Sequence, residues 1–224
     1  MNDTYRIDVG AGRLIDSQGR RYDAAARRWL ENPADPVGGA ERDVTAGGSG
    51  GGNEEIVDAP AAVRWLQRSS GTPLRMPIGV IGSCDATSVQ MEVSARIGAG
   101  LAGMGLTVLC GGRHGVMEAV ARGSSEAGGV SIGLLPDATA EHANPYLSHV
   151  IATGIGEARN ALVARAAFCL VVIVDSYGTL SEVALGLQFG KRVFGIEGAA
   201  RVHGVEHRRD VDSVLRSVAL AVLG

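Results

Sequence analysis

Short apolar runs alternate with helical patterns over most of the chain. From Pro77 onward, the runs typical of strands are IGVIG (78–82), LTVLC (106–110), VSIGLL (130–135), HVIA (149–152), CLVVIV (169–174) and RVFGI (192–196). Helical patterns lie between most of them, at 87–103, 115–127, 157–168 and 179–190, and a last helix is expected over about 208–223. Strands that are apolar on both faces and alternate with helices are typical of a covered parallel sheet. With right-handed crossovers, this predicts an α/β fold, namely a Rossmann-like doubly wound parallel sheet with helices on both faces.

The N-terminal part of the chain follows a different pattern. Apolar and polar residues alternate along YRIDV near the start, which predicts a short β-hairpin within residues 5–23. Residues 24–31 are expected to form one or two helical turns, and helical character returns over residues 56–69. The stretch between is rich in Gly, Pro and charge, which favours a flexible linker. The predicted parts are therefore a small N-terminal hairpin and helical turn (1–31), a linker (32–55), a helix and lead-in (56–76) and the Rossmann-like domain (77–224).

Composition narrows the class of protein. The chain has 224 residues, of which 46% are apolar and 20% are charged, and this suffices for a hydrophobic core. The net charge of −3 argues against binding of nucleic acid or a membrane surface through bulk positive charge. The widely spaced Cys84, Cys110 and Cys169 form neither a disulfide framework nor a metal knuckle, which favours a reducing compartment. Since neither a membrane span nor a secretory signal is visible, we expect a cytoplasmic protein.

Glycine is enriched where predicted strands meet helices. The chain has 33 glycines, about twice the usual ~7% share. Four junctions combine glycine with small or polar residues: GSCDAT (82–87), GGRHGVM (111–117), TGIGEARN (153–160) and DSYGT (175–179). Such residues are ordinary in turns and helix caps. However, the carboxyl ends of parallel strands share one edge of the sheet, and helix N-termini that converge there bind phosphate without many lysines. Four such junctions together therefore predict a ligand site, in a chain whose single lysine is Lys191.

Standard nucleotide and metal motifs do not fit this chain. The segment GLQFGKR (186–192) has a Gly-Lys pair, but its spacing is too short for a phosphate loop and Ser/Thr is missing. The segment GIGEAR (154–159) has Arg where the last glycine of the dinucleotide fingerprint belongs, which argues against a standard NAD enzyme. His203 and His207 lie four residues apart, but the intervening Gly204 argues against a helical zinc pair, and His114 is interpreted as a solvated loop residue.

Three stretches carry a resemblance to a known family. They are CGGRHGVMEAVARGSSEAGGVSIGLLP (110–136), ANPYLSHVIATGIGEARN (143–160) and SYGTLSEVALGLQFGKRV (176–193). In this order they resemble the LONELY GUY superfamily, whose members were formerly mislabelled as lysine decarboxylases, and within it the molybdenum cofactor carrier branch most. The resemblance covers about residues 77–197. LONELY GUY enzymes cleave the N-glycosidic bond of nucleoside 5′-monophosphates, whereas the carrier proteins bind the phosphate-bearing molybdopterin cofactor without turning it over.

The resemblance implies roles for particular residues. Gly178, Thr179 and Glu182 match the end of the family's Gly-Gly-x-Gly-Thr-x-x-Glu loop, Arg159 matches the family's arginine, and Asn160 stands where the enzymes have lysine. Thr179 and the nearby amides would hold a phosphate together with Arg159. In an enzyme, Arg159 and Glu182 would be catalytic, with Glu182 stabilising the cationic sugar. The full set of expected ligand-binding residues is Gly82, Ser83, Thr87, Gly111, Gly112, Gly115, Met117, Arg159, Asn160, Ser176, Gly178 and Thr179, and no metal site is expected.

The chain departs from the family pattern in the phosphate loop. Val174, Asp175 and Ser176 stand where the family has Pro-Gly-Gly or Gly-Gly-Gly. Within ~4 Å of a phosphate, and at an effective dielectric constant of ~20, the charge of Asp175 would cost about 4 kcal/mol. Asp175 therefore either points away, for example as a cap of the following helix, or the ligand is placed differently.

Three hypotheses follow for the function. The first is a binding protein for a phosphate-bearing nucleotide-like or molybdopterin-type ligand that requires no other cofactor, which Asn160 and the altered loop favour. The second is a nucleoside 5′-monophosphate phosphoribohydrolase of the cytokinin-activating type, which the retained Arg159 and Glu182 support. The third is a regulatory or structural module whose ligand site has decayed. The resemblance implies a homodimer or higher homo-oligomer, formed through helices at 115–127 and 157–168. From the net charge, we expect no nucleic-acid or membrane partner.

Overall fold

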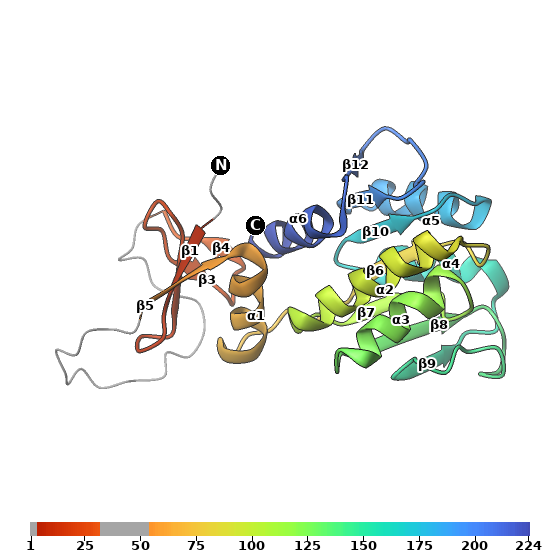
Figure 1. The fold of residues 1–224 in the computed structure, drawn as a ribbon, viewed down its shortest axis with the longest axis horizontal. Coiled ribbons are helices and arrows are strands. Elements are labelled where there is room, and N and C mark those ends of the chain that lie inside the picture. Colours follow the sequence, from red (N-terminus) through yellow and green to blue (C-terminus); the bar gives the residue numbers. More distant parts are fainter. Residues whose placement is uncertain (1–3, 32–53) are drawn as a thin grey trace. The chain divides into compact units, whose positions relative to one another are not determined.

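The computed structural model describes residues 4–31 and 54–224 (Figure 1). These residues form two compact units. The larger unit comprises Arg75–Val218, and the smaller unit contains the chain up to Leu74 together with Ala219–Gly224. Most of the predicted linker, residues 32–53, lies outside the described residues, and Glu54 and Glu55 at its end belong to a strand.

The larger unit is built on a seven-stranded sheet in the order β12-β11-β10-β6-β7-β8-β9. Every neighbouring pair of strands in this sheet is parallel, which confirms the predicted α/β fold. The strands are β6 (Ile78–Gly82), β7 (Val108–Cys110), β8 (Ser131–Leu135), β9 (His149–Ala152), β10 (Leu170–Ile173), β11 (Val193–Ile196) and β12 (Val205–His207). Within this unit the chain begins at β6 and passes through β7 and β8 to the edge strand β9. It then crosses to β10, which pairs with β6 on the side opposite to β7. The strand order therefore reverses between β6 and β10, which is where ligands bind in open α/β sheets.

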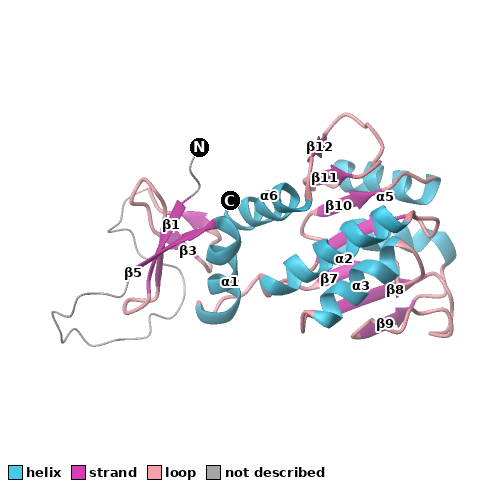
Figure 2. Cartoon of the chain, viewed as in Figure 1, coloured by secondary structure: helices cyan, strands magenta, loops and turns pink. Residues whose placement is uncertain are grey.

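Helices cover both faces of this sheet (Figure 2). Right-handed crossovers place α2 (Ser88–Gly103) and α3 (Val116–Glu126) on one face, and α4 (Asn160–Ala166) and α5 (Tyr177–Gln188) on the other. The short 3₁₀ helix η1 (Gly156–Arg159) leads directly into α4, and α6 (Val211–Leu223) follows β12. The strands β6, β7, β10 and β11 are almost entirely buried, as expected for a sheet that is covered on both faces.

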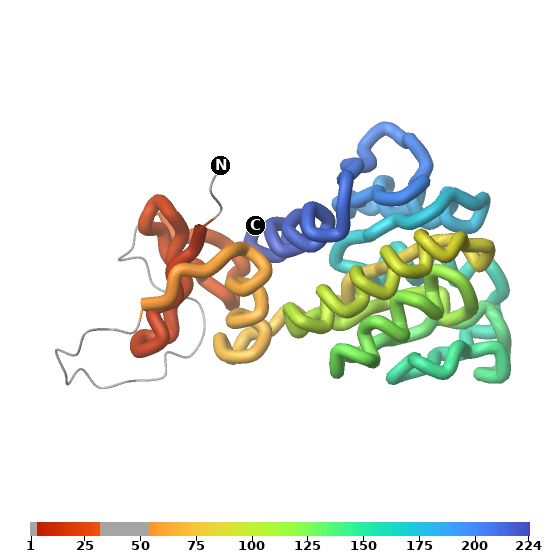
Figure 3. Tube along the Cα trace, viewed as in Figure 1, coloured from red at the N-terminus to blue at the C-terminus, as the bar shows by residue number. Residues whose placement is uncertain are grey.

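The smaller unit combines antiparallel strands with one helix. Its three-stranded sheet has the order β2-β1-β5, formed by β1 (Thr4–Asp8), β2 (Arg13–Ile15) and β5 (Glu54–Asp58), and the helix is α1 (Ala59–Ser69). The tube view shows the red and orange segments of this unit, with the dark-blue C-terminus marked (Figure 3). The Tyr22 hydroxyl donates a hydrogen bond to the Val222 carbonyl oxygen at 3.0 Å. The end of the chain therefore contributes to the packing of its beginning.

The structure differs from the sequence predictions at three places. Residues 24–31 form no helical turn, because β3 (Tyr22–Asp23) pairs with β4 (Arg28–Trp29), and the Asp23 carboxylate accepts hydrogen bonds from two amides in the turn between them. The helical pattern at 56–69 begins with the last residues of β5, and α1 starts only after Asp58, whose side chain caps it at the Ala61 amide. Strand β12 was not expected, because VEH is short and polar.

Among the described residues, none of the helices is long and apolar enough to cross a membrane.

Candidate functional site

The carboxyl ends of β6 and β7 bring two of the predicted loops together. The Val116 amide at the start of α3 donates to the Ser83 carbonyl oxygen at 3.1 Å. Gly115 has a positive φ of 65°, and a side chain there would collide with the backbone of Ser83 and Cys84. Gly82 is equally enclosed, by the Ile173 carbonyl oxygen and by Val116. Both glycines are thus needed for the close packing at this edge of the sheet.

Two expected ligand residues in the loop after β6 hold that loop in shape. The Thr87 hydroxyl accepts the Gln90 amide at 3.3 Å, and the Gln90 side chain accepts the Thr87 amide at 2.8 Å, so Thr87 caps α2. The Ser83 hydroxyl accepts the Asp85 amide at 3.0 Å. The structure therefore gives Thr87 and Ser83 local partners in the chain itself.

Arg159 lies at the centre of the site. It ends η1 and is only 5% exposed. Its guanidinium group lies over Gly111, since a β-carbon at position 111 would come within 2.6 Å of Nη1 and 2.7 Å of Nη2. The sulfur of Met117 would lie 2.6 Å from the same β-carbon. Gly111 and Met117 therefore form a cradle for this arginine, which explains why the loop after β7 needs glycine at its first position.

The partners of Arg159 leave part of its side chain unsatisfied. Its Nη1 lies 3.5 Å from Oε1 of Glu182, which comes from α5 and is also only 5% exposed. Its Nε is buried and has no hydrogen-bond partner within residues 4–31 and 54–224. Buried guanidinium nitrogens without partners are costly, so this atom marks a place where a ligand oxygen would be stabilising.

The N-terminus of α5 is built by Ser176 and Asn160. The Ser176 hydroxyl accepts the Thr179 amide at 3.1 Å and lies 2.8 Å from the Thr179 hydroxyl. The Asn160 amide group donates to the Ser181 hydroxyl at 3.1 Å and to the Gly178 carbonyl oxygen at 3.4 Å. Asn160 thus ties the start of α4 to the start of α5.

The altered phosphate loop keeps the backbone shape that a glycine would give it. Val174 has a positive φ of 66°, a conformation that a β-branched residue rarely adopts. Ser176 caps the following helix, so Asp175 does not, and the alternative that Asp175 serves as the cap was wrong. Asp175 is exposed beside the loop.

Burial governs the protonation of two groups in the site. It raises the pKa of Glu182 to about 8, although the charge of Arg159 lowers this pKa, and Glu157 raises it further. Burial also raises the pKa of the Cys110 thiol, at the end of β7, to about 11. At neutral pH both groups are mostly uncharged, so Arg159 is the charged member of this buried group of three side chains.

Comparison with known proteins shows the family to which this chain belongs. A model of the SLOG cluster4 family matches residues 75–220, well over half of the chain. The chain belongs to the SLOG cluster4 family. An uncharacterized protein from Archaeoglobus fulgidus is 34% identical to it over 130 residues, which are 58% of this chain and 85% of that protein.

Two solved structures are similar to the SLOG part of the chain. The molybdenum cofactor binding protein from Rippkaea orientalis has a TM-score of 0.64 at 28% identity, and the match covers 66% of this chain and 99% of that one. The molybdenum cofactor carrier protein from Chlamydomonas reinhardtii has a TM-score of 0.62 at 29% identity, over 67% and 100% of the two chains. These matches confirm the resemblance to the LONELY GUY-like superfamily and its carrier branch.

Two residues that support the SLOG site were not anticipated. The Asn144 side chain donates to the carbonyl oxygens of Gly112 and Arg113, each at 3.1 Å, and so holds the glycine loop. Arg113 contacts both Asp137 oxygens at 3.1 Å and keeps the pKa of that carboxyl below its usual value, and it lies 3.7 Å from Glu157 on η1. Asn144 lies in an irregular stretch, where no periodic signal in the sequence could have indicated it.

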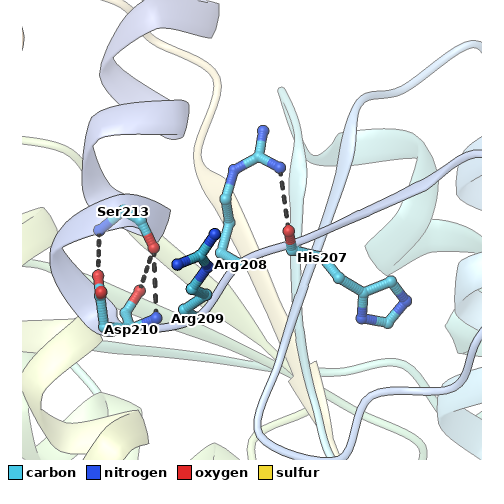
Figure 4. A pocket seen from close by; sticks show the side chains of 5 residues that line it. All are labelled: His207, Arg208, Arg209, Asp210 and Ser213. Atoms are coloured by element: carbon cyan, nitrogen blue, oxygen red, sulfur yellow. Dashed lines mark hydrogen bonds between the residues drawn. The ribbon is translucent and has the colours of Figure 1, made fainter.

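A hollow elsewhere in the SLOG part is lined by residues around the start of α6 (Figure 4). The Asp210 carboxylate accepts the Ser213 amide at 2.8 Å, so this helix start already has an anionic cap. His207 lies in the strand β12, so it does not share a helix with His203. Within the described ranges, no three or more His, Cys, Asp or Glu side chains gather in a way that could hold a metal ion.

Proposed function

We propose that this chain binds a phosphate-bearing ligand of the nucleotide or molybdopterin type at the carboxyl ends of β6, β7 and β10, and that it carries this ligand without cleaving it. The observation that carries the proposal is Arg159, a buried arginine whose Nε lacks a partner among the described residues. Taking a cation out of water is costly unless an anion or hydrogen-bond acceptors compensate it. An oxyanion of the ligand provides that compensation.

The surrounding backbone supports an anionic ligand. The N-termini of α3 and α5 follow β7 and β10, and each brings a partial positive charge to the same edge of the sheet. One amide at each start, Val116 and Thr179, already has a partner within the chain. The absence of a side chain at Gly111 lets the guanidinium group lie directly against the backbone of the loop after β7. Two of the similar solved structures are named for binding or carrying the molybdenum cofactor, which supports a ligand of this type.

Two features favour binding over cleavage. With a pKa of about 8, Glu182 is mostly protonated at neutral pH, so it supplies little negative charge to stabilise a developing sugar cation. Asn160 has no positive charge, and its side-chain amide is already engaged with Ser181 and Gly178. The phosphoribohydrolase hypothesis keeps only the Arg159 and Glu182 pair in its favour.

Calorimetric titration of the purified protein with AMP and, separately, with molybdenum cofactor tests the proposal. We expect binding of a phosphate-bearing ligand without release of adenine from AMP. Arg159→Ala should weaken binding more than tenfold, because a hydrogen bond to a charged group contributes ~1.5–3 kcal/mol. Arg122→Ala, an arginine on α3 away from its N-terminus, is the matched control and should retain wild-type affinity.

Two outcomes would overturn this function. Free adenine, detected by chromatography after incubation with AMP, would favour the phosphoribohydrolase instead. Failure of both AMP and molybdenum cofactor to bind would favour a module whose ligand site has decayed.

A further inference from the structure

We propose that Glu182 serves this site as a protonated carboxylic acid, which donates a hydrogen bond beside Arg159 to an oxyanion of the ligand, and that loss of this proton weakens binding. The inference rests on the proposed function and assigns the way in which that site is regulated. It makes Glu182 a hydrogen-bond donor, where the sequence comparison implied an anionic catalytic group.

The geometry of the pair is unlike that of a satisfied ion pair. A charged hydrogen bond between nitrogen and a carboxylate oxygen is usually ~2.7–2.9 Å long, and arginine often makes two of them to one carboxylate. Here the contact between the guanidinium and the carboxyl group, from Nη1 to Oε1, is 3.5 Å long. Both side chains are buried, and the arginine Nε remains without a partner among the described residues. Two full charges at this depth would be expected to pair more closely.

The groups around Glu182 favour its neutral form. Arg159 and Glu157 act on it from η1: the arginine lowers its pKa, and Glu157 raises it. From β7, Cys110 faces it as a thiol whose own pKa is raised to about 11, so it adds no charge at neutral pH. The strands β6, β10 and β11 contribute only apolar residues and glycine to the packing of α5. On α4, the charge of Arg165 is directed to the Phe189 ring, which it covers at 3.5 Å.

The state of Glu182 then decides the charge that the ligand meets. Its pKa of about 8 leaves the acid neutral below pH 8, so the Arg159 charge is available to the ligand. Above pH 8 a carboxylate competes for Arg159 and repels the incoming anion. A bound anion also raises the pKa of Glu182, because like charges nearby disfavour ionisation. Binding above pH 8 is therefore coupled to the uptake of a proton, and we expect Kd to rise about tenfold per pH unit there.

Calorimetric titrations with AMP between pH 7 and pH 9.5 measure this coupling directly. A phosphate monoester with a second pKa of ~6 stays almost fully charged over this range. We expect the wild-type Kd to be nearly constant up to pH 8 and to rise above it, with uptake approaching one proton in buffers of different ionisation enthalpy. Glu182→Gln should show no such rise, and it should bind more tightly than Glu182→Ala at pH 7, because the amide still donates. Glu126→Gln, an exposed glutamate at the end of α3, should keep the wild-type pH profile.

A measurement without ligand separates this inference from the proposed function. Glu182 ionises near pH 4.5 when unfolded and near pH 8 when folded, so the folded state binds more protons between these values. Wild-type stability should therefore fall relative to Glu182→Gln as the pH rises from 5 to 8. A constant difference would overturn the protonated state, as would AMP binding that weakens with pH equally in wild type and Glu182→Gln. Absence of AMP binding with a pH-dependent stability difference would instead count against the ligand class.

Discussion

Gly111→Ala is the substitution that most directly tests how the site holds its arginine. A β-carbon at this position would lie 2.6 Å from the Nη1 of Arg159 and from the sulfur of Met117. Ordinary contacts of a β-carbon lie at 3.4–4 Å, so each of these groups must move by about 0.8 Å, the difference between 3.4 and 2.6. Both are ends of flexible side chains, and Gly111 has no positive φ. The backbone should therefore survive the change while the guanidinium is displaced.

The displacement should affect binding more than stability. A shift of this size breaks the alignment of a charged hydrogen bond, which contributes ~1.5–3 kcal/mol and corresponds to a loss of affinity of about ten- to a hundredfold. The overpacking itself costs at most ~1–3 kcal/mol, and the lower end applies because the colliding atoms can turn away. Calorimetric titration with a phosphate-bearing ligand measures the first effect, and urea denaturation measures the second.

A matched glycine provides the control for this experiment. At Gly103, the last residue of α2, a β-carbon would meet no atom of the surrounding structure within 4 Å. Gly103→Ala should therefore leave affinity unchanged and should stabilise the fold by ~0.4–1 kcal/mol. Wild-type affinity in Gly111→Ala would refute the reasoning, because the ligand would then not depend on where Arg159 lies. Global unfolding of the variant would equally contradict the claim that only side chains must move.

Two further predictions concern the loop and the assembly. Val174→Gly should raise the free energy of unfolding in urea by about 0.5–1 kcal/mol, because relief of ~1–2 kcal/mol of backbone strain at φ 66° exceeds the cost of the added unfolded-chain entropy. A loss of stability would show that the packing of the valine side chain dominates. As the control, Val171→Gly in the buried strand β10 should destabilise the fold. Sedimentation should show a homodimer or larger assembly. Leu162, which is 44% exposed on α4, should lie at its interface, so Leu162→Asp should weaken association more than tenfold. A wild-type monomer at high micromolar concentration would contradict this.

The parallel sheet was predictable because each buried strand is marked by a short apolar run that can be recognised from the local sequence. Runs such as CLVVIV are apolar at every position, which is typical of strands buried on both faces. The predicted ends match those of β6 and β9, and elsewhere they extend beyond the observed strands by one or two residues, as at 106–110, where β7 begins only at Val108. The error at 24–31 has a tertiary cause. The Trp29 ring stacks on Tyr5 at 5.8 Å and meets the edge of Tyr22 at 5.0 Å, and these contacts select a strand where AAARRWLE alone favours a helix.

The site was predictable in its parts but not in its arrangement. The glycine loops and the helix N-termini at the carboxyl edge follow from the order of strands and helices. The packing of the Arg159 guanidinium group against Gly111 does not follow from this order. It depends on how the chain after the edge strand β9 brings η1 back to the loop after β7. Two residues expected to touch the ligand, Thr87 and Ser83, also have hydrogen-bond partners in their own loop. Local sequence cannot separate these two uses of a hydroxyl group, because a helix cap and a phosphate ligand require the same residue types.

The departures from the family pattern form a consistent set once their contacts are known. Asn160 removes a positive charge and uses its amide to hold α5, and Ser176 satisfies an amide in the first turn of that helix. Val174 keeps the backbone turn that glycine would allow. In the proposed site, the buried cation that meets the anion is therefore Arg159. A single buried arginine attracts an anion only while its neighbour is uncharged, since an ionised Glu182 would already neutralise it. In the proposed site, the neutral state of Glu182 therefore matters all the more, because Asn160 adds no positive charge beside Arg159.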